Sequence, residues 1–533
     1  MGQTVIEKIA GAHGVSLDAP DRVRAGDFVT LRPRHVMTHD NTAAVLAKFR
    51  AIGAARVDDP AQPVFALDHD IQNRSEANLA KYAAIEAFAR EQGITFYPAG
   101  AGIGHQMMLE QGHALPGTLV VASDSHSNIY GAVGALGTPV VRTDAAAIWA
   151  TGEFWWQVPR TVQVVLDGAL PEGVTGKDLI LSLCGLYASG EVLNAAVEFA
   201  GEGVAGLSMD ARMTVANMTT EWGALVGWFP VDEVTCQWLE QRRARGVAID
   251  PQALAGWRAD PPRPDADAHY AGRIVVDLTQ VRPHVAGPDT VQAVTPLDVM
   301  AARRVAVDKA YLLSCVNSRY EDLAAAAAVL DGRRVADGVQ LFVAAASREI
   351  QQRCEAEGIW ETFRRAGAHF LQPGCGPCIG LGEGLLEPGE VGISATNRNF
   401  KGRMGSREAR CYLASPQVVA ASAVAGVICG PETTPSAPLE RRWQPAPAAP
   451  RSGGGVTIVE GFPEALEGRA LLVPQDNLNT DGIYSKDYTY REDVSREEMA
   501  RVVMENYDPA FSGLAREGDI LVGGWNFGTG SSR

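Results

Sequence analysis

The sequence lacks a long apolar segment, a cluster of basic residues and a dense set of cysteines. No run reaches the roughly 18 apolar residues of a membrane span, and the first ten residues resemble neither a signal peptide nor an arginine-rich transit peptide. Lysine and arginine number 47 against 63 acidic residues, for a formal charge of -16. This charge argues against binding to nucleic acid or anionic membranes, since phosphate binding needs clustered cations. Eight scattered cysteines in 533 residues fit a reducing compartment, so we expect a cytoplasmic protein.

Short β-rich runs alternate with alanine-rich helical stretches along most of the chain. The runs 117–122 and 310–314 each end in a polar loop, and the segments 82–92 and 322–330 have helical composition. This alternation predicts an α/β fold with parallel strands, whose carboxyl ends carry the functional sites. Asp124 and Cys315 both follow such a strand.

Residues 431–455 are rich in proline and include the run Gly453 to Gly455, a composition typical of an extended linker. Beyond the linker the chain resumes as a small α/β unit, and it ends at Arg533 just after the glycine turn 528–532. A helix should follow a strand and such a turn. We therefore expect a partial last domain, and little turnover from a chain that ends there.

Three cysteines make the most informative pattern. Cys375 and Cys378 form a C-x-x-C turn, and Cys315 comes from a separate segment. The set is one thiolate short of the full complement of a 4Fe-4S cluster. An iron without a protein thiolate keeps an open position and can act as a Lewis acid on a substrate hydroxyl or carboxylate. A zinc half-site or a redox pair is the alternative, but a second C-x-x-C and a thioredoxin-like unit are both missing.

Several polar residues have the types and spacing that acid-base chemistry and anion binding require. Histidine occurs in the polar segments 68–70, 104–106 and 124–127, and in two of these an aspartate neighbours the ring. A carboxylate partner can raise the pKa of an imidazole, which suits a proton donor for a departing hydroxide, although a lone histidine is usually structural. Asn217 and Glu221 are four apart and can share a helix face; a helix-start carboxylate is the alternative.

In so acidic a chain, an anionic substrate needs a locally basic pocket. Arg398 and Arg403 lie in a loop-like segment with asparagine and glycine, and planar guanidinium groups suit bidentate carboxylate binding. The terminal Gly-Thr-Gly-Ser-Ser-Arg lacks the lysine of a phosphate loop. Ser531 in this glycine turn would instead have backbone N–H donors and Arg533 nearby to stabilise an alkoxide.

Taken together, these motifs resemble the aconitase superfamily over essentially the whole chain. The resemblance rests on S-C-V-N-S at 314–318, P-G-C-G-P-C-I-G at 373–380, D-S-H at 124–126, N-R-N-F-K-G-R at 397–403 and G-S-S-R at 530–533. It implies an aconitase-like core of three α/β/α domains, a linker and a truncated C-terminal swivel domain. The expected bounds are 1–163, 164–290 and 291–430 for the core, 431–455 for the linker and 456–533 for the partial swivel domain.

The resemblance further implies a hydro-lyase that cycles a tricarboxylate through an enzyme-bound cis-alkene. Its 4Fe-4S cluster, with one open iron, would be held by Cys315, Cys375 and Cys378. The implied catalytic residues are Ser531 as base with Arg533, His69 with Asp68 as acid, and His105, Asp124 and His126 around them. The implied substrate-binding residues are His39, Ser125, Asn217, Glu221, Asn397, Arg398, Arg403 and Ser532.

Two positions depart from the common pattern of the superfamily. Val316 replaces a usual threonine beside Cys315, and His39 stands where aconitase itself has a substrate-binding glutamine, which favours the other subfamilies. The alternatives are 3-isopropylmalate dehydratase or another aconitase-like hydro-lyase, a cluster-free RNA-binding regulator, and an inactive fragment. We expect a small di- or tricarboxylate as partner, no nucleic acid, no membrane, and a monomer if the chain is full length.

Overall fold

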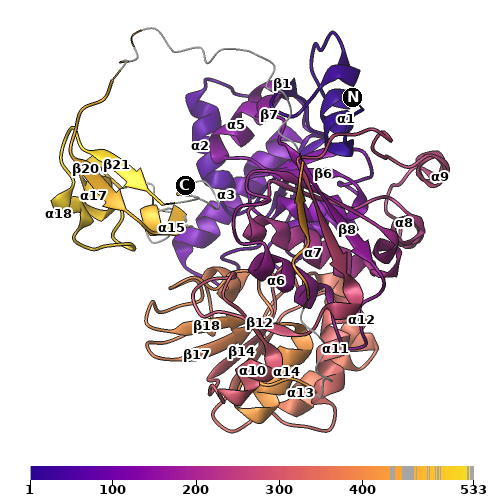
Figure 1. Cartoon of the computed structure of the whole chain (residues 1–533), viewed down its shortest axis with the longest axis vertical. Coiled ribbons are helices and arrows are strands. Elements are labelled where there is room, and N and C mark those ends of the chain that lie inside the picture. Colours follow the sequence, from indigo (N-terminus) through magenta and orange to yellow (C-terminus); the bar gives the residue numbers. More distant parts are fainter. Residues whose placement is uncertain are drawn as a thin grey trace. The chain divides into compact units, whose positions relative to one another are not determined.

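The structure is a computed structural model that describes residues 2–431, 439–446, 461, 463, 465–476, 478, 480–485, 488, 491, 494–524 and 527–528. The chain divides into two compact units, Met1–Gln444 and Pro445–Arg533. Among the described residues, no helix combines the length and apolar character needed to cross a membrane. Figure 1 shows helices layered against sheets throughout the first unit, which confirms the expected α/β fold.

The first sheet of the larger unit is five-stranded and wholly parallel. Its strand order is β4 (Thr95–Tyr97), β3 (Pro63–Ala66), β2 (His35–Thr38), β5 (Leu119–Ala122) and β6 (Leu136–Pro139). Its helices are α1 (Val5–Ala12), α2 (Thr42–Ala51), α3 (Glu76–Gln92), α4 (Gly104–Glu110) and α5 (Arg142–Thr151). Strands β3 and β5 are buried at every position, as expected for parallel strands covered on both faces.

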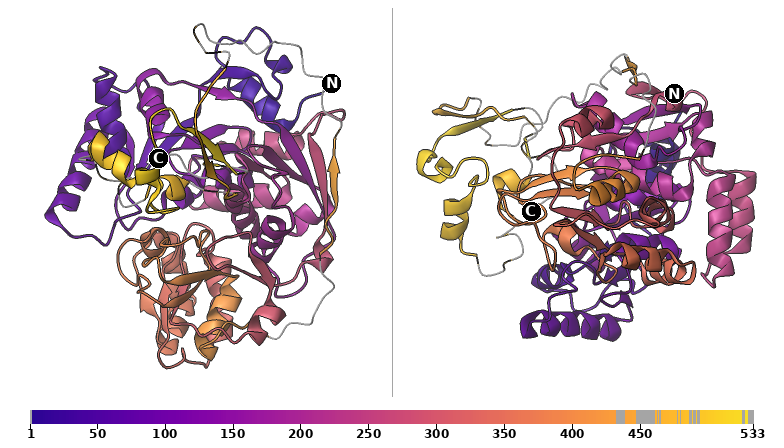
Figure 2. Two further views of the ribbon diagram at one scale, coloured as in Figure 1. Left: turned by 60° about the vertical axis from the view of Figure 1, so that its left-hand side comes forward. Right: turned by 90° about the horizontal axis from the view of Figure 1, so that it is seen from below.

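A second five-stranded sheet carries the middle of the chain. Its order is β10 (Val226–Trp228), β9 (Ala196–Ala200), β8 (Thr161–Asp167), β11 (Gly272–Asp277) and β19 (Trp443–Pro445). Its helices are α6 (Gly176–Leu186), α7 (Met209–Trp222), α8 (Glu233–Ala244) and α9 (Pro251–Ala259). Figure 2 shows α8 and α9, drawn in pink, side by side at one edge of the unit, where Arg258 pairs with Glu233 and Glu240.

The third sheet has seven strands and holds the cysteine segments. Its order is β13 (Val294–Pro296), β12 (His284–Ala286), β18 (Arg410–Leu413), β17 (Val391–Ser394), β14 (Lys309–Leu312), β15 (Gln340–Val343) and β16 (His369–Phe370). Its helices are α10 (Leu297–Ala302), α11 (Tyr320–Leu330), α12 (Arg348–Ala356), α13 (Ile359–Ala366) and α14 (Pro416–Ala425). Strand β12 runs antiparallel to both its neighbours, and the remaining pairs are parallel. A separate antiparallel ribbon joins β1 (Phe28–Leu31) to β7 (Phe154–Gln157).

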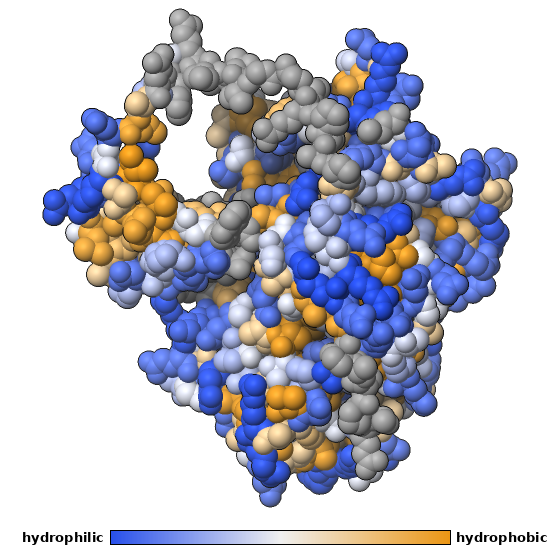
Figure 3. All heavy atoms as spheres, in the orientation of Figure 1, coloured by the Kyte–Doolittle hydropathy of each residue, from blue (hydrophilic) through white to orange (hydrophobic). Residues whose placement is uncertain are grey.

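The second unit has a parallel pair, β20 (Ala470–Val473) and β21 (Ile520–Gly523), with α15 (Thr480–Ile483), α17 (Arg496–Val502) and α18 (Phe511–Leu514). Its described core consists of Val473, Leu478, Met504 and Phe511. Leu466 and Leu472 stay about two-thirds exposed, at 65% and 66%. Figure 3 shows hydrophobic surface on this unit, whereas the visible face of the first unit is mostly hydrophilic.

The expected domain bounds remain a proposal. The expected boundary between the first and second core domains, at residues 163 and 164, lies within β8.

Candidate active site

The first sheet gathers three histidines and two aspartates at the carboxyl ends of β2, β3 and β5. Parallel strands end at one edge, so His39 after β2, Asp68 and His69 after β3, and Asp124 and His126 after β5 meet there. His105, in the first turn of α4, completes the group. The structure therefore brings together six residues that the sequence placed in separate loops.

Asp124 is the centre of this group. One carboxylate oxygen accepts from His105 Nε2 at 2.8 Å and lies 3.3 Å from His126 Nδ1, and the other lies 3.6 Å from His69 Nε2. Burial alone would raise the pKa of Asp124, but His105, His126 and His69 hold it well below its usual range. Asp124 is thus a buried anion shared by three imidazoles.

His69 and His39 are stacked, with ring centroids 3.8 Å apart and planes tilted by 14°. His69 Nδ1 donates to Asp68 at 2.5 Å. Burial opposes the charged ring, yet Cys375 and Asp68 raise the pKa of His69 well above its usual range. Burial, followed by the charge of His69, lowers the pKa of His39 to about 4. The surroundings therefore favour the protonated form of His69 and the neutral form of His39.

Glu221 connects the histidines to the arginine segment. Glu221 and Asn217 both lie on α7, and Glu221 accepts from His126 Nε2 at 2.9 Å and from Arg398 Nε at 2.9 and 3.0 Å. Burial alone would raise the pKa of Glu221, but Arg398 and then His126 lower it to about 2. The backbone carbonyl of Ser125 accepts from the Thr220 hydroxyl at 2.9 Å, which ties the 124–126 loop to the same helix.

Two of the three cysteines contact asparagine amides, and the third lies against the histidine loop. Cys315 follows β14, and its sulfur accepts from Asn217 Nδ2 at 3.2 Å and from Asn397 Nδ2 at 3.4 Å. Cys378 donates to Asn397 Oδ1 at 3.5 Å. Cys375 joins the histidine group, because its N–H donates to the carbonyl of Asp68 at 2.6 Å.

The approach of the cysteine turn to the histidine loop depends on Gly374. A Cβ atom at this position would lie 2.8 Å from the carbonyl oxygen of Asp68 and 2.5 Å from Ile71 Cδ1. Any larger residue would therefore push the two loops apart.

All eight cysteines are free. Burial raises the pKa of Cys315 to about 12 and that of Cys375 well above its usual range. Since thiolates are the form that binds metal, these buried thiols would ionise only against a bound cation. Three free thiols, of which Cys315 accepts from two amides and Cys378 donates to one of them, fit an iron-sulfur group and do not fit a disulfide scaffold.

Arg403 is buried, and its Nε has no hydrogen-bond partner among the residues that the structure describes. Its guanidinium lies 5.6 Å from the ring centroid of Phe400. A buried cation is costly unless an anion or hydrogen-bond acceptors compensate it. The position therefore suits a ligand carboxylate.

Two buried residues, Asp40 and Tyr130, complete the site, and sequence reasoning assigned neither. Asp40 accepts the backbone N–H groups of Asp68, His69 and Asp70 at 3.0, 2.8 and 3.0 Å, and also the Tyr82 hydroxyl. The Tyr130 hydroxyl lies 2.9 Å from His105 Nδ1. For Asp40 the sequence offers a signal, because the polar pair His39-Asp40 directly follows an apolar strand. Tyr130 lies in an apolar segment, and its sequence context gives no signal.

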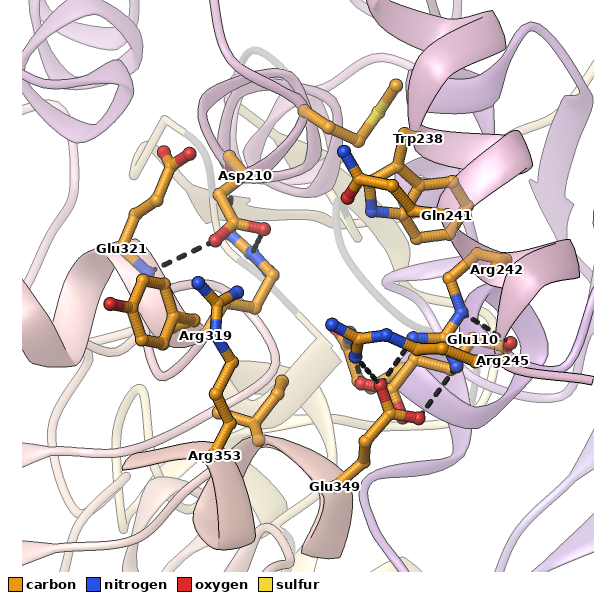
Figure 4. A pocket seen from close by; sticks show the side chains of 14 residues that line it. Glu110, Asp210, Trp238, Gln241, Arg242, Arg245, Arg319, Glu321, Glu349 and Arg353 are labelled. Carbon is orange, nitrogen blue, oxygen red and sulfur yellow. Dashed lines mark hydrogen bonds and ion pairs between the residues drawn. The ribbon is translucent and has the colours of Figure 1, made fainter. Parts of the chain in front are cut away.

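A separate cavity of about 140 Å³ lies where α4, α7, α8 and α12 come together, and its charged side chains pair with one another (Figure 4). Glu349 accepts from Arg242 at 2.5 and 2.7 Å and from Arg245, and Arg319 pairs with Asp210 at 3.4 Å. These pairs join parts of the chain that are far apart in sequence.

Ser531, Ser532 and Arg533 lie outside the described residues. Their expected roles as base, amide donor and anion ligand remain predictions.

Curated relatives align with the chain from end to end. It is 55% identical to the mitochondrial homoaconitase of Eremothecium gossypii, covering 100% of this chain and 80% of that protein. It is 52% identical to the mitochondrial homoaconitases of Cryptococcus neoformans and Yarrowia lipolytica, covering all of this chain and 79% and 80% of theirs. An aconitase X structure from Thermococcus kodakaraensis covers 69% of this chain and 84% of that chain at TM-score 0.40 and 12% identity, too distant to inform the site.

The expectation of a cytoplasmic protein is wrong by this comparison, since these relatives are named as mitochondrial. Cysteine usage separates reducing from oxidising compartments, but it does not separate the cytosol from an organelle that is also reducing.

The family model described as the aconitase family (aconitate hydratase) matches residues 7–426. This span contains the histidine group, Glu221, both arginines and all three site cysteines. The chain belongs to the aconitase family.

Proposed function

We propose that this protein is a homoaconitate hydratase, a hydro-lyase that interconverts homocitrate and homoisocitrate through cis-homoaconitate in the aminoadipate route to lysine. The observation that carries the proposal is identity of 52 to 55% over the whole chain to relatives named homoaconitase. The partner is a small tricarboxylate, and the acidic balance of the chain disfavours nucleic acid. We propose a monomer.

Membership of the aconitase family implies an iron-sulfur cluster. We propose a 4Fe-4S cluster held by Cys315, Cys375 and Cys378. When bound, the cluster would supply an open iron that acts as a Lewis acid on the substrate hydroxyl. The remaining chemistry belongs to side chains of this chain.

His69 is the proposed acid that protonates the departing hydroxide. Asp68 fixes its Nδ1, which leaves Nε2 on the side of Asp124, and the raised pKa keeps the ring charged at neutral pH. His105 and His126 hold Asp124 in place, and His126 also donates to Glu221 through its other ring nitrogen. The hydrogen bonds among these groups define one orientation for each ring.

Arg398 and Arg403 are the proposed carboxylate ligands, with His39, Ser125, Asn217, Glu221 and Asn397 lining the rest of the substrate site. The buried Nε of Arg403, which has no hydrogen-bond partner in the described part of the chain, supports this role most directly. The proposed base is Ser531, assisted by Arg533 and the amide of Ser532. A serine in a glycine turn with an adjacent arginine is suited to carry an alkoxide.

The first test is the cluster itself. We expect anaerobically reconstituted protein to bind iron and to show a broad visible absorption that bleaches in air. Cys375→Ser should abolish iron uptake, whereas Cys354→Ser should leave it unchanged, because Cys354 lies on α12 and is packed in a hydrophobic core cluster. Equal loss in both variants would overturn the ligand assignment.

The second test is the substrate. With a reconstituted full-length version of the enzyme, we expect hydration of cis-homoaconitate to have the highest kcat/KM, followed by cis-aconitate, because one missing methylene costs about 1–3 kcal/mol. Isopropylmaleate should rank last. Its isopropyl group would replace the distal carboxylate, and the groups that bind this carboxylate would then lack a partner. A ranking with isopropylmaleate first would overturn the homoaconitase proposal and leave the family assignment intact.

A further inference from the structure

Lys177 is a fully buried lysine that the proposed mechanism does not use. It is the second residue of α6, and its side chain has 0% exposure. The ammonium group donates to the carbonyl of Thr396 at 2.5 Å and to that of Ala395 at 3.3 Å. These carbonyls follow β17 directly and precede Asn397 and Arg398 in the chain.

No carboxylate in the described part of the chain forms an ion pair with Lys177. Asp322 and Asp178 favour the charged form of Lys177 without a hydrogen bond to it, and both have other donors. Asp178 accepts from the backbone and hydroxyl of Thr175, and Asp322 accepts from Asn317 and the backbone of Arg319. Lysine is almost never fully buried unless it is paired. Among the described residues, Lys177 is therefore a buried cation that two backbone carbonyls accept from and that has no direct carboxylate partner.

The cysteine site would add negative charge near Lys177 once its thiols ionise around a bound cluster. Cys378 is among the groups that act on Lys177 electrostatically. The segment that Lys177 holds leads into Asn397, whose amide contacts the sulfurs of Cys315 and Cys378. Three thiolates around a cluster carry more negative charge than the iron core neutralises, so a nearby cation stabilises the loaded site.

We propose that Lys177 is the buried counter-cation of the cysteine site and the tether of the 395–397 segment that presents Asn397 to it. The inference rests on the proposed cluster. Burial lowers the pKa of Lys177 to about 8, although Asp322 and Cys378 favour the charged form. The side chain is therefore still mostly charged at pH 7. Lys177 is a positioning residue that acts through Asn397 and through its charge.

The test compares Lys177→Gln, which keeps a donor but removes the charge, with Lys177→Arg, which keeps both. Lys48→Gln, on the exposed side of α2, controls for loss of one positive charge elsewhere. Iron per protein, the rate of iron loss to a chelator and the midpoint potential of the cluster by anaerobic EPR titration are measured on each full-length protein. Thermal unfolding of the apo-proteins shows whether a variant still folds.

We expect Lys177→Gln to lose iron at least about tenfold faster than wild type, since groups beyond the direct ligands typically change metal affinity by 10- to 100-fold. Its midpoint potential should be more negative, because a nearby positive charge favours the reduced cluster. Lys177→Arg should have a rate of iron loss and a midpoint potential close to those of wild type. Lys48→Gln should have the same values as wild type. If Lys177→Gln fails to fold, Lys177→Met, which removes both the charge and the donor, is compared with Lys177→Arg instead.

Unchanged iron loss and midpoint potential in Lys177→Gln, with a cluster present in wild type, would overturn the role of Lys177 alone. A shift of the same size in Lys48→Gln would also overturn it. A wild-type protein that takes up no cluster would instead overturn the cluster proposal, and this inference with it.

Discussion

At the scale of single residues, the site depends on charges that compensate one another away from water. Asp40 receives three backbone N–H groups from the loop that carries His69, and against burial the neighbouring His69 and His39 lower its pKa to about 2. A carboxylate that accepts several backbone N–H groups fixes a loop without entering the reaction. Asp40 therefore sets the position of the proposed acid.

Replacing Asp40 by Asn should reduce kcat by roughly 10- to 100-fold, because a misplacement of about 1 Å in a reacting group can cost that much. Iron content should stay unchanged. Steady-state kinetics of the reconstituted protein measure the effect. Asp70→Asn is the matched control, since its carboxylate accepts from Asn73 in an exposed position. Equal kcat values for both variants would show that Asp40 does not position His69.

At the scale of elements, buried polar side chains tie strands and helices together over long distances in the chain. Glu198 on β9 accepts from the backbone of Ile6 in α1 at 3.1 Å and from the Tyr270 hydroxyl at 2.8 Å. Arg242, a buried side chain of α8, pairs with the partly exposed Glu349 of α12 and so joins these two helices. Such contacts hold layers in register, and burial makes them sensitive to protonation.

Glu198 should make the stability of the first unit depend on pH. Burial raises its pKa to about 7, above the value of 4.5 expected when unfolded. Its stabilising contribution is therefore complete below pH 4.5 and is lost as the pH rises through about 7. We expect wild type to lose roughly 3 kcal/mol relative to Glu198→Gln between pH 5 and pH 8. Urea unfolding of both proteins at the two pH values measures this, and a constant difference would contradict it.

Glu349→Gln should lower the free energy of unfolding by about 1–3 kcal/mol, because it leaves the buried guanidinium of Arg242 without its carboxylate. The measurement is the shift of the main thermal transition. Glu361→Gln is the control: Glu361 pairs with Arg364 on the exposed face of one helix, where an ion pair contributes little. Similar shifts in both variants would argue against a joining role for Glu349 (Figure 4).

At the scale of the whole molecule, the chain has two units with separate cores. The first unit contains large clusters of buried apolar residues, whereas the described core of the second is small and leaves Leu466 and Leu472 exposed. An isolated two-stranded sheet is only marginally stable. The two units therefore differ in the apolar area that holds them together.

We expect two thermal transitions in calorimetry, with the smaller one at lower temperature. Limited proteolysis below the second transition should leave a fragment close to residues 1–444 that retains iron. The physical reason is that stability grows with buried apolar area. A single transition, with both units cleaved together, would contradict the expectation.

The sequence by itself determined the fold class, the cysteine set and the loops that carry histidine, because strand, loop and helix alternation depends on near neighbours in the chain. It also placed Asn217 and Glu221 on one helix, where a spacing of four suffices. Only the tertiary structure decided which buried charges face one another. Asp40 lies about 30 residues from the loop it holds, and Lys177 lies 219 residues from the carbonyl of Thr396. A lysine near the start of a helix suggests a solvated side chain, and nothing local reveals that folding buries it beside a cysteine site.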